Sequence, residues 1–213
     1  MPDLNEIASA VIAGDAARVS GLVEAALAEG TEASEILEQG LTAGMAVVGR
    51  RFRANEIFVP EVLVAARAMK AGMVHLDPIF SAAGVVPVGT FVIGTVRGDI
   101  HDIGKNLVGM MLRGAGFRIV DLGVNVAPQV FVDAVQREGA QLVGLSALLT
   151  TTMVQMRPTI DALRAAAPET KILVGGAPVS PEFATSIGAD GYGANASDAV
   201  DRALELIGRP AES

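Results

Sequence analysis

The chain has 213 residues, 51% of them apolar, and a formal net charge of −8 at pH 7. The lack of cysteine excludes disulfides, thiolate metal sites and a cysteine nucleophile, and with only two histidines besides we expect no structural zinc site. The acidic balance argues against nucleic-acid binding, and no apolar stretch is long enough to span a membrane, so we expect a cytoplasmic protein that binds neither nucleic acid nor membrane.

The N-terminal part has the apolar spacing of helices, with Val19, Leu22 and Val23 among the residues that recur along one helical face. Short turns separate these segments, which is typical of a helical bundle. About four helices are predicted, over residues 3–14, 15–30, 31–52 and from Pro60 onward. We therefore predict a four-helix bundle domain over residues 1–84.

The pattern changes after a linker with Gly and Pro, residues 85–89, where short apolar runs begin to alternate with helical segments. Strands that are apolar on both faces, each followed by a helix, are typical of a parallel sheet covered by helices on both sides. The predicted strands are residues 90–95, 117–121, 141–146, 171–175 and 190–192. The predicted helices are residues 103–115, 128–138, 153–167, 180–187 and 197–207. Residues 90–213 thus form a predicted α/β domain with a flavodoxin-like, Rossmann-like five-stranded parallel sheet.

In a sheet of this order, ligands bind beyond the carboxyl ends of the strands, at the switch point between the first and third strands. The loops at that point hold the two most unusual segments of the chain. The first is "RGDIHDIGKN", residues 97–106, which contains one of the two histidines. The second is "SALLTTT", residues 146–152. We expect the chemistry of the protein to lie there.

Other ligands of such sheets match these loops less well. Five residues separate Gly98 from Gly104, and Asn106 stands where a phosphate loop needs a hydroxyl for magnesium. The dinucleotide pattern G-x-G-x-x-G is absent from this turn, and Ser146 ends the third strand where a phospho-acceptor domain would need an aspartate. A flavin stays open from the fold alone, although a chain with no Trp and one Tyr has few rings to stack on it.

Three separated motifs follow the first, third and fourth predicted strands in order: Asp99-x-His101-x-x-Gly104, Ser146-x-Leu148 and Gly175-Gly176. Together they resemble the signature of cobalamin-binding domains, as in methionine synthase and in the corrinoid proteins of methanogens and acetogens. The segment "VVGRRFRANEIFVPEVLVAARAMK" is similar to the helical cap domain that precedes the cobalamin domain in that family. The resemblance therefore covers essentially the whole chain.

The resemblance assigns His101 to the lower axial position of the cobalt ion, in place of the nucleotide base of the cofactor. It makes Asp99 the acceptor that holds the second ring nitrogen of His101 and so fixes the tautomer. It extends this pair by a hydroxyl, which corresponds to Thr152 in this chain. The implied binding mode has the cofactor base off and the histidine on the metal.

Further cofactor contacts are implied along the groove for the nucleotide tail and on the helical cap. Ser146 and Thr150 would bond the buried base, glycines would let the backbone approach the tail, and Phe52 with Val59 would pack over the methyl group. Asn195 departs from the family, in which an aspartate is frequent there. The complete set that the resemblance assigns to the cofactor is Phe52, Val59, Asp99, His101, Gly104, Ser146, Leu148, Thr150, Thr152, Gly175, Gly176 and Tyr192.

Three further residues have ordinary structural interpretations. Asp102 and Lys105 are predicted to be surface or helix-start residues, because they follow the histidine motif at the beginning of a helix. His75, the second histidine, matches no motif position and is predicted to be structural.

The resemblance implies a corrinoid protein that carries a methyl group on cobalt between two methyltransferases, in a cycle of Co(I) and methyl-Co(III), with cobalamin or methylcobalamin bound. The implied partners are a donor-specific methyltransferase, a second methyltransferase acting on tetrahydrofolate or a thiol, and a reductive activator of Co(II). No catalytic residue is expected in the chain, and no activity of the chain alone. A cobalamin-dependent sensor or regulator and the cobalamin subunit of a mutase remain as alternatives. The former would need a signalling or DNA-binding module, and the latter normally lacks the cap.

Overall fold

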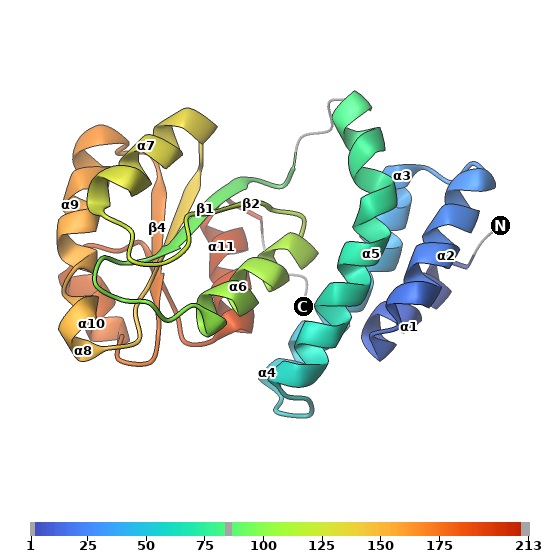
Figure 1. Ribbon diagram of the computed structural model, residues 1–213, viewed down its shortest axis with the longest axis horizontal. Helices are drawn as coiled ribbons and strands as arrows, with labels where there is room; N and C mark the ends of the chain where they lie inside the picture. Colours follow the sequence, from blue (N-terminus) through green and yellow to red (C-terminus); the bar gives the residue numbers. More distant parts are fainter. Residues whose placement is uncertain (1–2, 84–86, 210–213) are drawn as a thin grey trace. The chain divides into compact units, whose positions relative to one another are not determined.

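The computed structural model describes residues 3–83 and 87–209 (Figure 1). The chain divides into two compact units, one helical and one built on a parallel sheet. The helical unit takes in residues up to 86 together with Gly114–Gly116, and the α/β unit takes in residues 87–113 and 117–213. Of the predicted linker, residues 85 and 86 lie outside the described part of the chain.

The helical unit packs aliphatic side chains and methionines from its long helices into one core. Buried examples are Ile7, Val23, Leu41, Val48 and Leu76. Its elements are α1 (Leu4–Ala13), α2 (Ala16–Ala28), α3 (Ala33–Glu35), the π-helix η1 (Ile36–Thr42), α4 (Ala43–Arg53) and α5 (Val59–Ala83). The apolar spacing of the sequence thus forms a set of amphipathic helices that bury one face each.

The prediction of a single α-helix over residues 31–52 is wrong, because the π-helix η1 interrupts it for 7 residues. Gly40 lies in this wider segment, and a Cβ there would be 3.0 Å from Ile7 Cγ2 of α1. Gly40 therefore lets the backbone of η1 pack closely on α1. Apolar spacing does not reveal such a segment, since a π-helix closes its hydrogen bonds over one more residue than an α-helix without leaving the helical pattern.

His75 of α5 has a partner inside the helical unit. Its Nε2 lies 2.7 Å from the hydroxyl of Ser20, which belongs to α2. This hydrogen bond joins two packed helices and supports the structural role predicted for the second histidine.

The α/β unit has the predicted five-stranded sheet, all of whose neighbouring strands pair in parallel in the order β2-β1-β3-β4-β5. Its strands are β1 (Thr90–Thr95), β2 (Arg118–Asp121), β3 (Leu142–Ser146), β4 (Lys171–Gly175) and β5 (Gly191–Gly193). Its helices are α6 (Ile103–Gly114), α7 (Pro128–Glu138), α8 (Thr150–Met153), α9 (Met156–Ala166), α10 (Pro181–Ser186) and α11 (Ala196–Leu206). The fold class is confirmed, although the helix predicted at 153–167 is divided into α8 and α9.

Helices cover both faces of this sheet (Figure 1). Alternate residues of a strand point to opposite faces of the sheet. The atoms that an added Cβ would meet at a strand glycine therefore show which helix packs on that face. A Cβ at Gly94 of β1 would lie 2.8 Å from the Phe131 ring of α7, and one at Gly191 of β5 would lie 3.3 Å from Leu206 of α11. A core cluster of buried residues lies on the face that Gly94 points to, where α7, α9 and α10 contribute side chains.

The carboxyl ends of the strands lie level with one another. Strand pairing places Thr95 beside Ser146, Ser146 beside Gly175, and Gly175 beside Gly193. The loops that follow β1, β3 and β4 therefore meet at one edge of the sheet, which is where parallel α/β proteins bind their ligands. In the described part of the chain, no helix is both long enough and apolar enough to cross a bilayer.

Replacing Gly94 by Ala should lower the free energy of unfolding by about 1–3 kcal/mol, because the added methyl group overlaps the buried Phe131 ring. Urea denaturation of the full chain measures this change. Gly109→Ala, inside α6, is the matched control, because a Cβ there would lie at an ordinary contact distance of 3.7 Å from Ile119 of β2. Alanine favours the helix over glycine, so this variant should raise the free energy of unfolding by up to about 1 kcal/mol. Equal stabilities of the two variants would contradict the packing of α7 on the sheet.

Candidate cofactor-binding site

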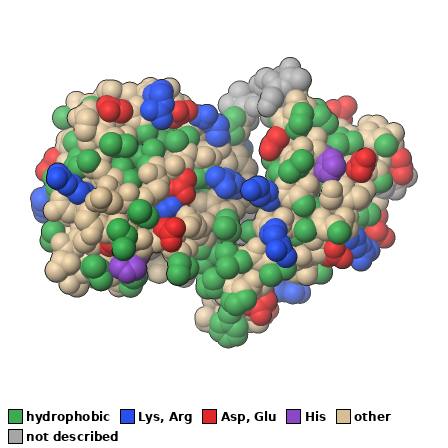
Figure 2. Space-filling view, in the orientation of Figure 1, with side chains coloured by type: hydrophobic (Ala, Val, Ile, Leu, Met, Phe, Trp, Pro, Cys, Tyr) green, Lys and Arg blue, Asp and Glu red, His purple; other side chains and the backbone are tan. Residues whose placement is uncertain are grey.

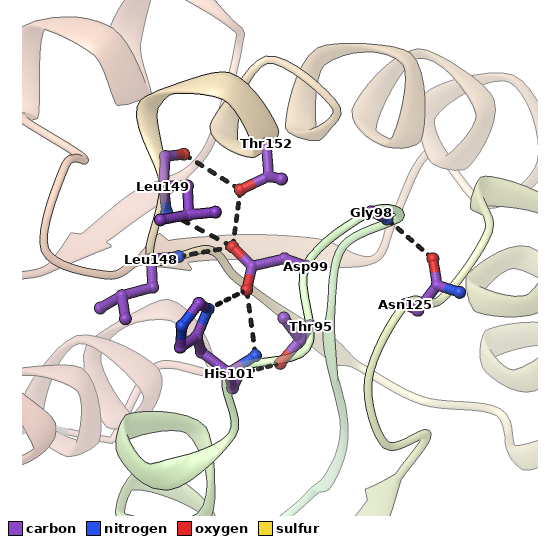
Figure 3. A network of polar contacts seen from close by, with 8 residues as sticks. All are labelled: Thr95, Gly98, Asp99, His101, Asn125, Leu148, Leu149 and Thr152. Atoms are coloured by element: carbon purple, nitrogen blue, oxygen red, sulfur yellow. Dashed lines mark hydrogen bonds and ion pairs between the residues drawn. The ribbon is translucent and has the colours of Figure 1, made fainter.

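Asp99 is a fully buried residue between β1 and α6, and donors from two loops surround its carboxyl group (Figure 3). Its Oδ1 accepts hydrogen bonds from the backbone N of His101, at 3.0 Å, and from the ring Nδ1, at 2.7 Å. Its Oδ2 accepts from the Thr152 hydroxyl at 2.6 Å and from the amides of Leu148 and Leu149 at 2.8 and 3.4 Å. Asp99 thus ties the loop after β1 to the segment after β3.

These donors determine the charge of Asp99. Burial by itself raises the pKa of the carboxyl group, but the hydrogen bonds from the Thr152 hydroxyl, the Leu148 amide and His101 outweigh it and hold the pKa far below its usual value. Asp99 is therefore a carboxylate, whose oxygens can only accept hydrogen bonds.

The carboxylate fixes the tautomer of His101. Since Asp99 can only accept, the ring proton of a neutral His101 lies on Nδ1, and the lone pair lies on Nε2. The His101 side chain is 45% exposed, and Nε2 has no hydrogen-bond partner among the residues that the structure describes. The site therefore presents one oriented imidazole nitrogen that can bind a metal ion.

Large apolar side chains are exposed around the same two loops. Hydrophobic side chains reach the surface of the α/β unit in several places (Figure 2). Four belong to the segments that Asp99 joins: Ile100 is 73% exposed, Ile103 78%, Leu148 45% and Leu149 43%. Apolar side chains gathered at a polar site suit a ligand with a broad apolar surface.

A groove of about 310 Å³ opens at this edge of the α/β unit. That volume is within the range of sites for small organic ligands. Its walls come from β1, β3 and β4, from the first turn of α6 and from the loop that leads into α11. The lining is rich in small and apolar residues and includes Phe91, Ile93, Gly104, Val108, Ser146, Leu173, Gly175, Gly176, Asn195 and Ala199.

Four of the predicted contact residues line this groove, and three of them are glycines. Gly176 has a left-handed backbone (φ 125°), and a Cβ there would lie 1.8 Å from the carbonyl oxygen of Ala147, so only glycine fits. A Cβ at Gly104 would meet nothing within 4 Å and would project into open space. Gly175 and the Ser146 hydroxyl complete this part of the predicted set.

The remaining predicted contacts lie elsewhere. Tyr192 pairs with Val174 and packs against the core cluster on the α7 and α9 face, so its side chain points away from the groove. Thr150 is exposed at the start of α8 and does not line the groove. Phe52 and Val59 belong to the helical unit, in α4 and at the first residue of α5, and both are half-buried. The prediction that Tyr192 contacts the cofactor is not supported by this geometry.

Lys105 lies at the start of α6, as one of its two predicted interpretations has it, but it is not a surface residue. It is buried, and its ammonium group donates to both carboxylate oxygens of Asp121, at 2.6 and 2.5 Å, and to the Asn106 side chain at 2.7 Å. The spacing of Lys105 with the half-buried Val108 and the buried Leu112 places it on the inner face of α6, which is a signal the sequence contained. Asp102 is exposed at the helix start, as predicted.

The protein ligands available near His101 indicate which kind of metal cofactor could bind there. The described residues contain no cluster of three or more His, Cys, Asp and Glu side chains that could hold a metal ion by themselves. One imidazole nitrogen therefore suits a metal that arrives with most of its ligands already attached. A corrin ring brings four nitrogen ligands, leaves an axial position free and has a tail that a neighbouring groove could receive, so these residues fit a corrinoid.

Comparison with known proteins relates both parts of the chain to cobalamin binding. A B12 binding domain model matches residues 89–201, and a second B12 binding domain model matches residues 3–77. Together the two matches extend over most of the described chain, and they include the helical unit.

Relatives match over nearly the whole length. A corrinoid protein of Desulfitobacterium hafniense (strain Y51) is 40% identical over 97% of this chain and 98% of its own. Dimethylamine corrinoid protein 3 of Methanosarcina acetivorans is 42% identical over 96% of each chain. A chain in the crystal structure of the methanol:cobalamin methyltransferase complex of Methanosarcina barkeri is 33% identical, with a TM-score of 0.84 over 94% of this chain and 78% of that one. The protein belongs to the family of cobalamin-binding corrinoid proteins of methyltransferase systems.

Proposed function

We propose that the protein carries a methyl group on the cobalt of a bound corrinoid between two methyltransferases. One would take the group from a small methylated donor, and the other would pass it to an acceptor such as tetrahydrofolate or a thiol. The names of its relatives, which refer to dimethylamine and to a methanol methyltransferase complex, support this class of donor and partner. A reductive activator that returns Co(II) to Co(I) completes the proposed set of partners.

The observation that carries this proposal is the single exposed ring nitrogen of His101, held by a buried carboxylate. When bound, the corrinoid supplies a cobalt ion that accepts and releases the methyl group. His101 would bind that ion through Nε2 from one side. Asp99 holds the proton on Nδ1, and Thr152 with the Leu148 amide holds Asp99.

The groove supports the base-off, His-on binding mode. If His101 held the cobalt, the nucleotide base of the cofactor would need a site of its own. The groove beside β3 and β4 offers about 310 Å³ for it, with the Ser146 hydroxyl as a hydrogen-bonding group. Gly104 keeps side-chain atoms out of that volume, since a Cβ there would meet nothing within 4 Å, and Gly176 allows the close approach of backbone to Ala147 beside it.

The other side of the corrin needs protection from water and from oxidants. We propose that Phe52 and Val59 contact the cofactor, because both side chains are apolar and only half-buried. Exposed Ile100, Ile103 and Leu148 would lie under the ring on the opposite side.

Replacing His101 by Ala should abolish nitrogen superhyperfine coupling in the electron paramagnetic resonance spectrum of the Co(II) form. Cobinamide, which lacks the nucleotide base, is the corrinoid to use, because any axial nitrogen then comes from the protein. His75→Gln is the matched control, since His75 bonds Ser20 in the helical unit, and it should leave the coupling unchanged. Coupling that persists in His101→Ala would disprove the ligand assignment.

Replacing Gly104 by Leu should weaken cobalamin binding by about tenfold or more, because the side chain would fill the groove in which we place the nucleotide tail. Binding of cobinamide should change by less than about twofold, since cobinamide has no nucleotide to place there. Titrations followed by absorbance measure both affinities, with Gly109→Ala in the same helix as the control. Equal losses for the two corrinoids would show that the groove does not receive the tail.

A further inference from the structure

Asn125, in the loop between β2 and α7, bonds the backbone on both sides of the Gly98–Asp99 peptide, and Figure 3 shows its bond to Gly98. Its side-chain Oδ1 accepts a hydrogen bond from the backbone N of Gly98 at 2.8 Å. Its own backbone N donates to the carbonyl oxygen of Asp99, also at 2.8 Å. Asn125 is exposed, and its hydrogen bonds to this loop reach the backbone of Gly98 and Asp99 rather than the Asp99 carboxylate or the His101 ring.

The tight turn that precedes the Asp99 side chain leaves one backbone N–H, that of Gly98, in need of a hydrogen-bond acceptor. The backbone N of Asp99 donates to the carbonyl oxygen of Val96 at 3.1 Å, which closes a tight turn over residues 96–99. Gly98, third in this turn, has a left-handed φ of 83°, as the turn type requires. Its N–H has no acceptor inside the turn, and the Asn125 side chain supplies one.

The position of Asn125 is itself fixed by the end of β1. Thr95 donates from its backbone N to the Gly123 carbonyl at 3.0 Å and accepts at its own carbonyl from Val126 N at 2.9 Å. Asn125 lies between these two bonds with a left-handed φ of 54°, a conformation that asparagine tolerates better than most residues. The amide oxygen that receives Gly98 is thus held by the sheet.

We propose that Asn125 is a positioning residue, which aligns Asp99 and through it the metal-binding nitrogen of His101. The inference rests on the proposed function. The Asp99 carboxylate accepts hydrogen bonds from the His101 ring at 2.7 Å and from the Thr152 hydroxyl at 2.6 Å at the same time, and these two donors belong to different segments of the chain. Hydrogen bonds weaken steeply outside a narrow range of distance and angle, so a turn that moves freely cannot satisfy both. Asn125 removes that freedom.

Three variants separate the side-chain acceptor from the backbone conformation. Asn125→Gly keeps the left-handed backbone and loses the acceptor, Asn125→Asp keeps both, and Asn125→Ala loses both. In cofactor-free protein, nitrogen NMR of the His101 ring reports the tautomer. In protein loaded with Co(II) cobinamide, paramagnetic resonance reports the ratio of His-ligated to unligated cobalt.

Asn125→Gly should lower the ratio of His-ligated to unligated cobalt by about fivefold, the effect of losing one net hydrogen bond. It should also raise the population of the tautomer with the proton on Nε2, whereas Asn125→Asp should restore both values. The urea midpoint of Asn125→Gly should stay close to that of the wild type, because the residue is exposed. Asn125→Ala should show the same loss and serves as a second variant if Asn125→Gly does not fold.

His101→Ala in the same cobinamide experiment separates the possible failures. If His101→Ala loses the nitrogen coupling while Asn125→Gly retains wild-type ligation and tautomer, this inference is overturned and the proposed function stands. A loss in Asn125→Gly that Asn125→Asp does not restore would also overturn it, since the acceptor would then not be the cause. If His101→Ala keeps the coupling, the ligand assignment and the role of Asn125 fail together.

Discussion

A buried carboxylate that can only accept hydrogen bonds is the interaction on which the site depends. Burying the charge of Asp99 is costly unless donors surround it, and here the donors come from His101, from Thr152 and from backbone amides after β3. Because one of those donors is the Nδ1 of His101, satisfying the carboxylate also selects the tautomer that leaves Nε2 free. The hydrogen bond that satisfies the buried charge therefore also orients the nitrogen that we propose binds cobalt.

The parallel sheet makes this arrangement possible. Its register places the ends of β1, β3 and β4 level with one another, so loops about fifty residues apart in the chain supply the two halves of the Asp99 environment. The groove is formed at the same edge, where glycines rather than larger residues follow β4. The α/β unit thus contains both features that the proposed ligand requires, which are the free ring nitrogen of His101 and a groove that could hold the nucleotide tail.

Much of this was available from the sequence, because strand and helix patterns fix the order of elements and the switch point fixes where ligands bind. Asp99, His101 and Thr152 could be placed by a motif whose members lie on defined loops. Packing details could not. Lys105 is charged but lies on the inner face of α6 because Asp121 pairs with it, and Tyr192 faces the core because its register with Val174 points it there. The role of Asn125 depends on a left-handed backbone that no residue spacing indicates.

The central claim is that the imidazole of His101 binds cobalt from one side of a corrinoid. It is tested most directly by labelling the histidines of the unmodified chain with nitrogen-15, loading it with unlabelled cobalamin and recording the paramagnetic resonance spectrum of the Co(II) state. A histidine ligand predicts that each cobalt line splits into a doublet, because nitrogen-15 has spin one-half. A triplet identical to that of the unlabelled protein would mean that the cofactor's own base holds the metal, and would contradict the account.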